Sequence, residues 1–289
     1  MHLEGTESPH DTGDFADLGD LGEDMWLVLG GGGLKGLSQV GVWRALTEIG
    51  IRPAGIVGTS IGALIGAMAA SGSSWQEMRD HALSMEKTDI ARINRRVAWI
   101  NGIRQQSVFQ GDSLIEYYEG LLPAGGWDAM ELPLLINAVD LADGSTEWFG
   151  SGARTDLSLV DAVYASSALP VFYPPLEVGD HAFVDGGTSH PLALERAEVA
   201  GASGIIGVDV GSGETGDVDK ILKQGMLAVH ERIFGIMTYR RRQELLATWD
   251  GPPLVYIRPR LDGYATFDFK SIEYFLDEGY RAAMEVFGG

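Results

Sequence analysis

The chain has 289 residues, no cysteine and a formal net charge of −20 at pH 7. The absence of cysteine excludes disulfide frameworks, thiolate zinc sites and cysteine nucleophiles, and the negative charge argues against nucleic acid as a partner because it repels a phosphate backbone. With 45% hydrophobic residues, the chain is long enough for one large domain, or two small ones, whose core needs no disulfide or metal.

Residues 1–24 are acidic and contain several glycines. Such a segment buries too little apolar surface to offset its ordering entropy, so we expect a disordered acidic tail over 1–24 and a single folded domain over 25–289. The sequence lacks the basic start and apolar run of a secretory signal, and it lacks the roughly 20 apolar residues of a membrane span. We therefore expect a cytoplasmic protein.

The folded part begins with two strand–helix units. Residues 25–29 form an apolar run that ends in glycines, which is typical of a strand buried on both faces. An amphipathic helix follows and ends at Gly50. A second strand over 55–57 leads into an apolar helix over 61–70. This order predicts a parallel sheet with right-handed crossovers.

The alternation of strands and helices continues along the chain. Ser74 and Glu77 form a capping box that begins a helix, and Asp143-Gly144 predicts a hairpin turn. One long helix is expected over 218–249. The other elements are expected at 134–139, 146–149, 157–167, 182–184, 205–210, 254–257 and 271–287. The fold class that we predict is α/β, with three layers and a central, mostly parallel sheet between helices.

The first motif is a glycine-rich loop, Gly30-Gly31-Gly32-Gly33-Leu34-Lys35-Gly36, between a strand and a helix. Glycines let backbone N–H groups turn toward an anion, and the helix N-terminus adds a favourable dipole. The loop could hold a phosphate or a developing oxyanion. A plain tight turn is the alternative, because one such loop is weak evidence.

The second motif, Gly58-Thr59-Ser60-Ile61-Gly62, has the G-x-S-x-G pattern of a nucleophile elbow between a strand and a helix. A serine nucleophile needs a base. Of the six histidines, only His190 lies just past a predicted strand end, where the functional residues of an α/β sheet gather. Asp185 lies there too, before Gly186 and Gly187, although a turn or cap role is the alternative for it.

The three motifs together, in this order, resemble the patatin-like phospholipase family, and in particular its bacterial members. Three further segments are similar as well: 137–141 with Gly144, 165–175, and 258–287. The resemblance covers nearly all of residues 25–289. It implies a patatin-like fold and a serine acyl hydrolase that uses a Ser–Asp dyad without histidine, metal or cofactor.

The resemblance also implies a role for each motif residue. Ser60 would attack the ester carbonyl and form an acyl-enzyme, and Asp185 would take and return the proton. The oxyanion hole would comprise Gly31, Gly32, Gly33 and Lys35, where Lys35 braces the loop or adds positive charge. Gly58, Gly62, Gly186 and Gly187 would support the elbow and the aspartate turn. His190 stands where the family often has asparagine, and we expect a hydrogen-bonding role for it.

We therefore expect a hydrolase of lipid carboxylic esters, acting on the acyl chains of phospholipids or lysophospholipids. One alternative is a short-chain carboxylesterase on soluble esters. Another is a dinucleotide-binding oxidoreductase, but the second strand ends in Gly58-Thr59-Ser60, without the acidic residue that a ribose requires. A lipid-binding or scaffold protein without catalysis is a third, and the presence of both Ser60 and Asp185 argues against it.

A basic segment stands out in this acidic chain. Residues 87–104 hold four arginines and one lysine against the single acid Asp89, with apolar residues interleaved. This pattern suits an anionic membrane, so we expect peripheral contact at the inner membrane surface through Arg92, Arg95, Arg96 and Trp99. A solvated cap with internal salt bridges is the alternative. A second cluster, residues 240–242, is expected on the solvent face of its helix.

Overall fold

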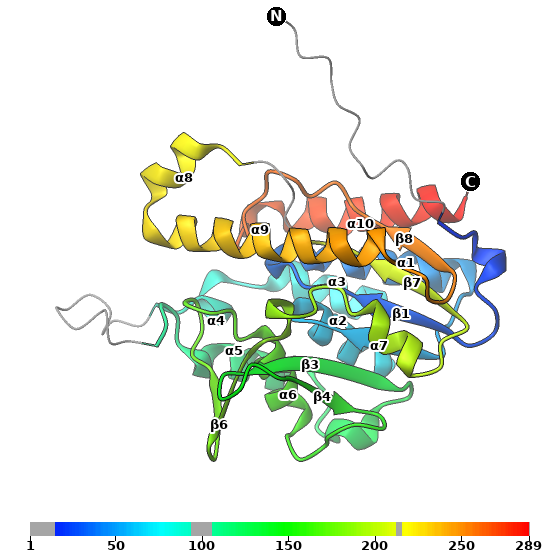
Figure 1. Cartoon of the computed structure of the whole chain (residues 1–289), viewed down its shortest axis with the longest axis horizontal. Helices are drawn as coiled ribbons and strands as arrows, with labels where there is room; N and C mark the ends of the chain where they lie inside the picture. The colour runs from blue at the N-terminus through cyan, green and yellow to red at the C-terminus, as the bar shows by residue number, and fades with distance from the viewer. Residues whose placement is uncertain (1–14, 94–105, 212–215, 289) are drawn as a thin grey trace, which may run out of the picture.

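The described part of the chain contains eight strands, which form one sheet. The computed structural model describes residues 15–93, 106–211 and 216–288 (Figure 1). The strand order is β5-β6-β3-β2-β1-β7-β8, and β4 pairs with β3. The strands are β1 (Met25–Leu29), β2 (Gly55–Gly58), β3 (Leu134–Asp140), β4 (Thr146–Gly150), β5 (Leu176–Val178), β6 (His181–Asp185), β7 (Gly204–Val208) and β8 (Leu254–Ile257).

Five adjacent strands, β3-β2-β1-β7-β8, are parallel, whereas β4, β5 and β6 pair antiparallel. Every residue of β1 and β7 is buried, as expected for strands that are covered on both faces. The strand β5 was not anticipated from the sequence, because its three residues are too few to show a periodic pattern.

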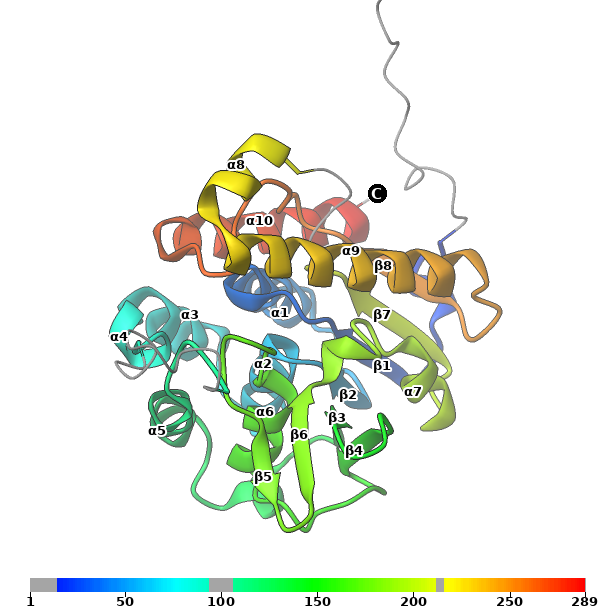
Figure 2. The same ribbon diagram turned by 60° about the vertical axis from the view of Figure 1, so that its left-hand side comes forward.

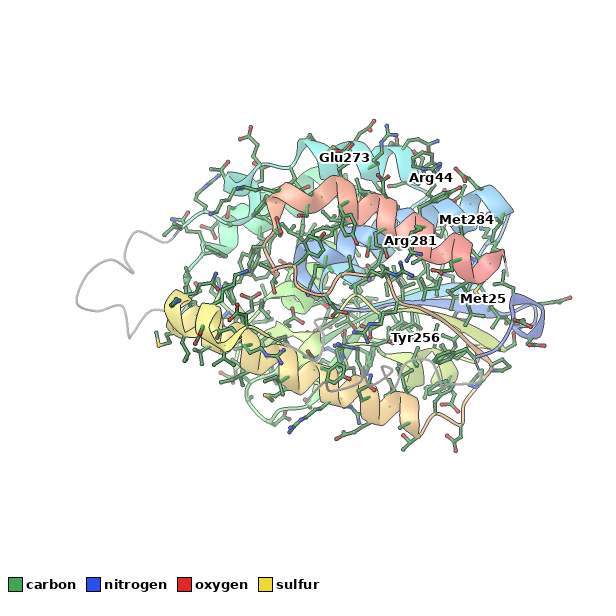
Figure 3. The ribbon with its side chains drawn as sticks, turned by 90° about the horizontal axis from the view of Figure 1, so that it is seen from above. Met25, Arg44, Tyr256, Glu273, Arg281 and Met284 are labelled. Atoms are coloured by element: carbon green, nitrogen blue, oxygen red, sulfur yellow. The ribbon has the colours of Figure 1, made fainter. Side chains whose placement is uncertain are left out.

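Helices cover both faces of the sheet, which confirms the predicted three-layer α/β/α fold. One layer contains α1 (Ser38–Ile49), α2 (Ile61–Ala70), α6 (Leu159–Ser167) and α10 (Ile272–Phe287), and the other contains α7 (Leu194–Val199) and α9 (Met226–Ala247). Alternate residues of β8 divide between the layers: Val255 packs in the first, and Leu254 packs with Leu245 of α9 in the second. Figure 3 shows Tyr256 of β8 between α9 and α10.

Shorter helices complete the fold and are α3 (Trp75–Ser84), α4 (Lys87–Ile90), α5 (Gly111–Leu121) and α8 (Val218–Gln224). The capping box that begins α3 is present, since Ser74 N–H donates to Glu77 and Glu77 N–H donates to Ser74. The single helix expected over 218–249 is wrong. Gly225, at a φ of 84°, separates α8 from α9, because this left-handed backbone interrupts the helix. Within the described ranges, no helix combines the length and apolar composition that a bilayer-spanning segment requires.

The segment 15–24 is ordered, so the expectation of disorder as far as residue 24 is wrong for these residues. Ala16 N–H donates to Leu254 O at 2.9 Å, and Phe15 stacks on Tyr256. Leu21 is buried, next to Gly204. These two apolar side chains anchor a stretch whose composition is otherwise polar. Residues 1–14 lie outside the described part of the chain.

Candidate active site

The serine and aspartate motifs meet because two strands end head-on along one edge of β3. β4 occupies the opposite edge of β3 over residues 135–139. On the shared edge, β2 runs parallel to β3 and ends with Gly58 opposite Ile136, whereas β6 runs antiparallel and ends with Asp185 opposite Ala138. One residue of β3 separates the two ends, so the turns that leave β2 and β6 lie next to each other.

Asn137 is that separating residue, and its buried side chain joins the two turns. Its Oδ1 accepts a hydrogen bond from Thr59 Oγ1 at 2.9 Å, and its Nδ2 donates to Gly186 O at 3.1 Å. Thr59 comes from the elbow and Gly186 from the aspartate turn. A single amide side chain therefore sets the spacing between Ser60 and Asp185.

Ser60 Oγ donates a hydrogen bond to Asp185 Oδ2 at 2.7 Å. Both side chains are buried, with 8% and 3% of their surface exposed. The second carboxylate oxygen, Oδ1, accepts from Gly187 N–H at 2.7 Å, which orients the carboxylate toward the serine. Burial raises the pKa of Asp185 to about 6, and the hydrogen bonds from Ser60 and Gly187 oppose that rise. A carboxylate of this pKa can accept a proton near neutral pH.

The backbone at Ser60 is strained. Its φ of 56° and ψ of −125° place a non-glycine residue in a sparsely populated region, as a nucleophile elbow requires. A Cβ at Gly58 would overlap Gly62 O, and a Cβ at Gly62 would overlap Leu29 O, so only glycine fits at either position. Ser60 N–H donates to Ser166 Oγ at 2.9 Å. This support from Ser166 on α6 was not assigned from the sequence, since nothing in the motif points to a residue 106 positions away.

Gly31 lies against Ser60, but its backbone N–H is not available to an anion. A Cβ on Gly31 would lie 3.2 Å from the Ser60 Cβ, so this glycine lets the loop approach the serine closely. Its N–H is already engaged, because it donates to Pro191 O at 3.0 Å. Gly31 therefore contributes space beside Ser60 rather than a donor for an anion.

Gly32 and Gly33 differ from Gly31 in their backbone N–H groups. Among the residues that the structure describes, neither N–H has an acceptor within hydrogen-bonding distance, and both residues line the pocket with Ser60. Gly33 has a φ of 61°, and a Cβ there would overlap Thr266. The N–H of Leu34 donates to Thr266 O at 2.8 Å and fixes the end of the loop. Two unsatisfied donors beside a buried serine can stabilise negative charge on a bound oxygen.

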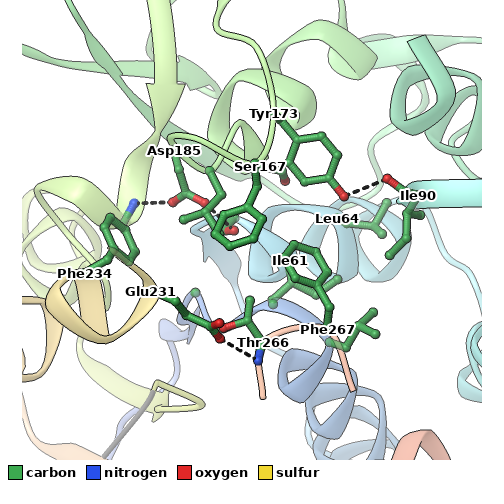
Figure 4. A pocket seen from close by; sticks show the side chains of 18 of the residues that line it. Ile61, Leu64, Ile90, Ser167, Tyr173, Asp185, Glu231, Phe234, Thr266 and Phe267 are labelled. Carbon is green, nitrogen blue, oxygen red and sulfur yellow. Dashed lines mark hydrogen bonds between the residues drawn. The ribbon is translucent and has the colours of Figure 1, made fainter. Parts of the chain in front are cut away.

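The pocket above Ser60 and Asp185 is lined mainly by aliphatic and aromatic side chains (Figure 4). They come from α2, α4, α5, the loop after α6 and the segment before α10, and include Leu64, Ile90, Leu114, Phe172, Tyr173 and Phe267. α9 contributes His230, Glu231 and Phe234 from the opposite layer. Such a lining suits an apolar chain that enters with its polar end near Ser60.

Comparison with known proteins places this arrangement in a family. The family model described as patatin-like phospholipase matches residues 27–197, more than half of the chain, including both Ser60 and Asp185. The chain belongs to the patatin-like phospholipase family. This confirms the resemblance and removes the basis for the dinucleotide-binding alternative, which rested on the glycine loop alone.

The relatives of this patatin-like chain are much longer proteins. It is 27% identical over 95% of its length to patatin-like phospholipase domain-containing protein 7 of Mus musculus, and over 96% to protein 6 of that series from Homo sapiens. Lysophospholipase nte1 of Aspergillus terreus is also 27% identical. The chain spans about a fifth of each. Among solved structures, VipD from Legionella pneumophila is similar over 91% of this chain and 66% of its own, at 14% identity and a TM-score of 0.49.

In this patatin-like domain, Lys35 of the glycine-rich loop does not line the pocket. It is buried, and burial lowers its pKa to about 8, opposed chiefly by the carboxylate of Glu231. Close by, Arg242 Nε pairs with Asp209 Oδ2 at 2.9 Å, and both side chains are buried. The expectation that Arg242 faces solvent is therefore wrong. Asp209 directly precedes Val210, whose carbonyl oxygen a Cβ at Gly32 would overlap, so the pair lies next to the glycine-rich loop.

His190 lies near Ser60 and Asp185, and its side chain hydrogen-bonds to neither of them. Its Nδ1 is 3.0 Å from Ser189 Oγ and 3.4 Å from Thr146 Oγ1. Its backbone O accepts a hydrogen bond from Thr59 Oγ1 at 3.1 Å. Burial lowers the pKa of its imidazole. The geometry fits the supporting role expected for His190, and it provides no histidine for a triad.

Only part of the basic segment can be placed. Arg92 is half-exposed and lies 3.9 Å from Glu116 of α5, a long and weak ion pair. Arg95, Arg96 and Trp99 lie outside the described residues. The expected membrane contact through this segment stays a prediction.

Replacing Asn137 by alanine should loosen the site. We expect Asn137→Ala to remove two buried hydrogen bonds, with Thr59 and with Gly186, and to cost about 1–3 kcal/mol of unfolding free energy. Ester turnover should fall by about tenfold or more, because the elbow and the aspartate turn lose their common anchor. Chemical denaturation and turnover of a soluble ester measure the two effects. Unchanged turnover in a destabilised variant would contradict the spacing role.

Proposed function

We propose that this protein hydrolyses carboxylic esters of lipids, with Ser60 as nucleophile and Asp185 as general base. The observation that carries the proposal is the 2.7 Å hydrogen bond from Ser60 Oγ to Asp185 Oδ2 at the base of an apolar pocket. The names of the relatives, which are phospholipases and lysophospholipases, point to the same substrate class.

The geometry supports two half-reactions through an acyl-enzyme. Ser60 Oγ attacks the ester carbonyl carbon while its proton moves to Asp185. The tetrahedral intermediate collapses, the bond to the leaving alcohol breaks, and Asp185 returns the proton to that oxygen. Asp185 then takes a proton from water as the water oxygen attacks the acyl carbon. The carboxylic acid leaves and Ser60 recovers its proton.

The N–H groups of Gly32 and Gly33 would hold the oxyanion in both tetrahedral intermediates. Each donor of this kind contributes roughly 3–4 kcal/mol to transition-state stabilisation. The buried Lys35 and the Arg242–Asp209 pair would keep the loop in place from behind. No histidine is needed, because burial raises the pKa of Asp185 to about 6 and so makes it a usable base.

We also propose that residues 25–289 form the hydrolase domain. The family match ends at residue 197, but β7 and β8 continue the same sheet beyond it. α9 then supplies one wall of the pocket. A domain cut at residue 197 would therefore lack both the edge of the sheet and that wall.

The substrate class can be tested with three esters side by side. We expect turnover of a long-chain phospholipid and a lysophospholipid to exceed that of a short-chain soluble ester in kcat/KM by about tenfold or more, because burial of each additional methylene contributes about 0.8 kcal/mol. Hydrolysis assays with matched micellar and monomeric substrates measure the ratio. A clear preference for the short-chain ester would favour a soluble carboxylesterase instead.

A further inference from the structure

Five large apolar side chains on α8 and α9 face solvent and form what we call the α8–α9 stripe: Val218, Leu222, Met226, Ile233 and Met237. Their exposed fractions lie between 53% and 83%. They are five of the fourteen exposed large hydrophobic residues in the described ranges, yet they fall within twenty positions. Single exposed apolar residues are ordinary, but a cluster of this kind marks an interaction surface.

The spacing of the stripe places its members on one face of each helix. Val218 and Leu222 lie four positions apart on α8, and Ile233 and Met237 lie seven and eleven positions after Met226 on α9. The body of the protein covers the opposite face of α9, where the buried residues are Gly235, Thr238, Arg242 and Leu245. α9 is thus apolar toward solvent without being a buried helix, which a surface helix normally avoids. α8 and the first turns of α9 form a corner of the molecule (Figure 2).

The stripe borders the pocket. His230 and Phe234 line the pocket from the same helical turns that carry the exposed Met226, Ile233 and Met237. His230 Nε2 lies 3.2 Å from Pro170 O, which ties this part of α9 to the loop after α6, where Phe172 also lines the pocket. A surface that covered the stripe would therefore lie directly beside the pocket wall.

The charges around the stripe are opposite to those of the chain. Helices α8 and α9 together contain six cationic and three acidic side chains, and one of the six, Arg242, is buried against Asp209, whereas the whole chain carries a net charge of −20. Lys220, Lys223 and Arg240 are exposed. Arg241 is exposed as well and pairs with Glu195. Apolar side chains with basic neighbours match an anionic lipid surface, where the apolar groups enter the acyl boundary and the cations meet head groups.

We propose that the α8–α9 stripe docks the protein on an anionic phospholipid surface and so places the pocket beside its substrate. The inference rests on the proposed lipid ester hydrolysis, and it adds the surface from which the substrate is taken. It is independent of the basic segment 87–104, because it uses described residues on other elements.

The test compares two triple variants. The stripe variant combines Met226→Gln, Ile233→Gln and Met237→Gln, and the control combines Leu83→Gln, Leu141→Gln and Val199→Gln, three comparably exposed apolar residues elsewhere. Sedimentation with vesicles of phosphatidylcholine and phosphatidylglycerol in equal amounts measures binding. We expect the stripe variant to lose about tenfold or more in vesicle binding and in turnover of vesicle phosphatidylglycerol, with soluble-ester turnover unchanged. The control variant should behave like wild type.

Vesicle binding by wild type should also weaken at high salt or without phosphatidylglycerol, since both changes remove the attraction of the cations. Equal vesicle binding by wild type and the stripe variant overturns the proposal, as does a wild type that binds no vesicles. A wild type that is a dimer in analytical ultracentrifugation, with a monomeric stripe variant, would assign this face to self-association and also overturn it. Vesicle binding without hydrolysis of any ester would leave the docking surface standing while contradicting the proposed function.

Discussion

We expect Ser60→Ala to lose ester hydrolysis, by about a thousandfold or more in kcat/KM, because the attacking oxygen is absent. Residual turnover can come only from binding and from the Gly32 and Gly33 donors acting on water. We expect the fold to be unchanged, because the hydrogen bond to Ser166 is donated by the backbone N–H of residue 60, which alanine keeps. Turnover of a soluble ester and circular dichroism measure the two properties.

A fluorophosphonate probe provides the companion measurement. It should label wild type at Ser60 alone, and it should leave Ser60→Ala unlabelled. Ser166 and Ser167 are suitable internal controls, because both are buried close to the site but neither has a carboxylate partner in the described structure. Labelling at either serine, or an active Ser60→Ala, would overturn the assignment of the nucleophile.

The parallel core and the positions of the two motifs were predictable because they depend on local patterns. Apolar runs ending in glycine mark β1 and β2, and the glycines at 58 and 62 mark the elbow. What brings Asp185 to Ser60 is different. β6 runs antiparallel and continues the edge of β3 where β2 stops, and no local pattern reports this pairing between distant strands. The sequence therefore indicated two functional turns without indicating why they meet.

The side chains that hold the site from behind were also beyond sequence reasoning. Asn137 acts through hydrogen bonds with Thr59 and Gly186, and Ser166 through one with Ser60, and these partners are 49 to 106 positions away. Arg242 looked like part of a solvent-facing cluster, but it is buried against Asp209. Periodicity could not place it, because α9 carries apolar residues on both its buried and its exposed face. The failures thus concentrate where long-range pairing overrides a local pattern.

The second large effect concerns the base. Asp185→Asn should lower kcat/KM by about a thousandfold or more, because asparagine keeps the size of the side chain but cannot accept the serine proton. In wild type, kcat/KM should rise with pH and level off above about 6, the raised pKa of the buried Asp185. His190→Ala is the matched control. Its expected loss is less than about tenfold, since only the backbone of His190 contacts the elbow.

Asp185→Asn should also stabilise the fold at neutral pH. The pKa of Asp185 is about 6 in the folded protein and near its ordinary value of 3.8 when unfolded, so the folded state binds this proton more tightly. Its contribution to stability is therefore lost as pH rises from about 4 to 6, and above that range the buried charge is a burden of about 1–3 kcal/mol. Asp185→Asn should thus raise the free energy of unfolding by this amount at pH 7 to 8, and the gain should vanish near pH 4. Denaturant unfolding at both pH values measures it. An Asp185→Asn variant that is inactive yet less stable than wild type at pH 7 would mean that Asp185 serves the fold rather than the chemistry. A thousandfold loss of kcat/KM in a folded His190→Ala variant would convert the proposed dyad into a triad.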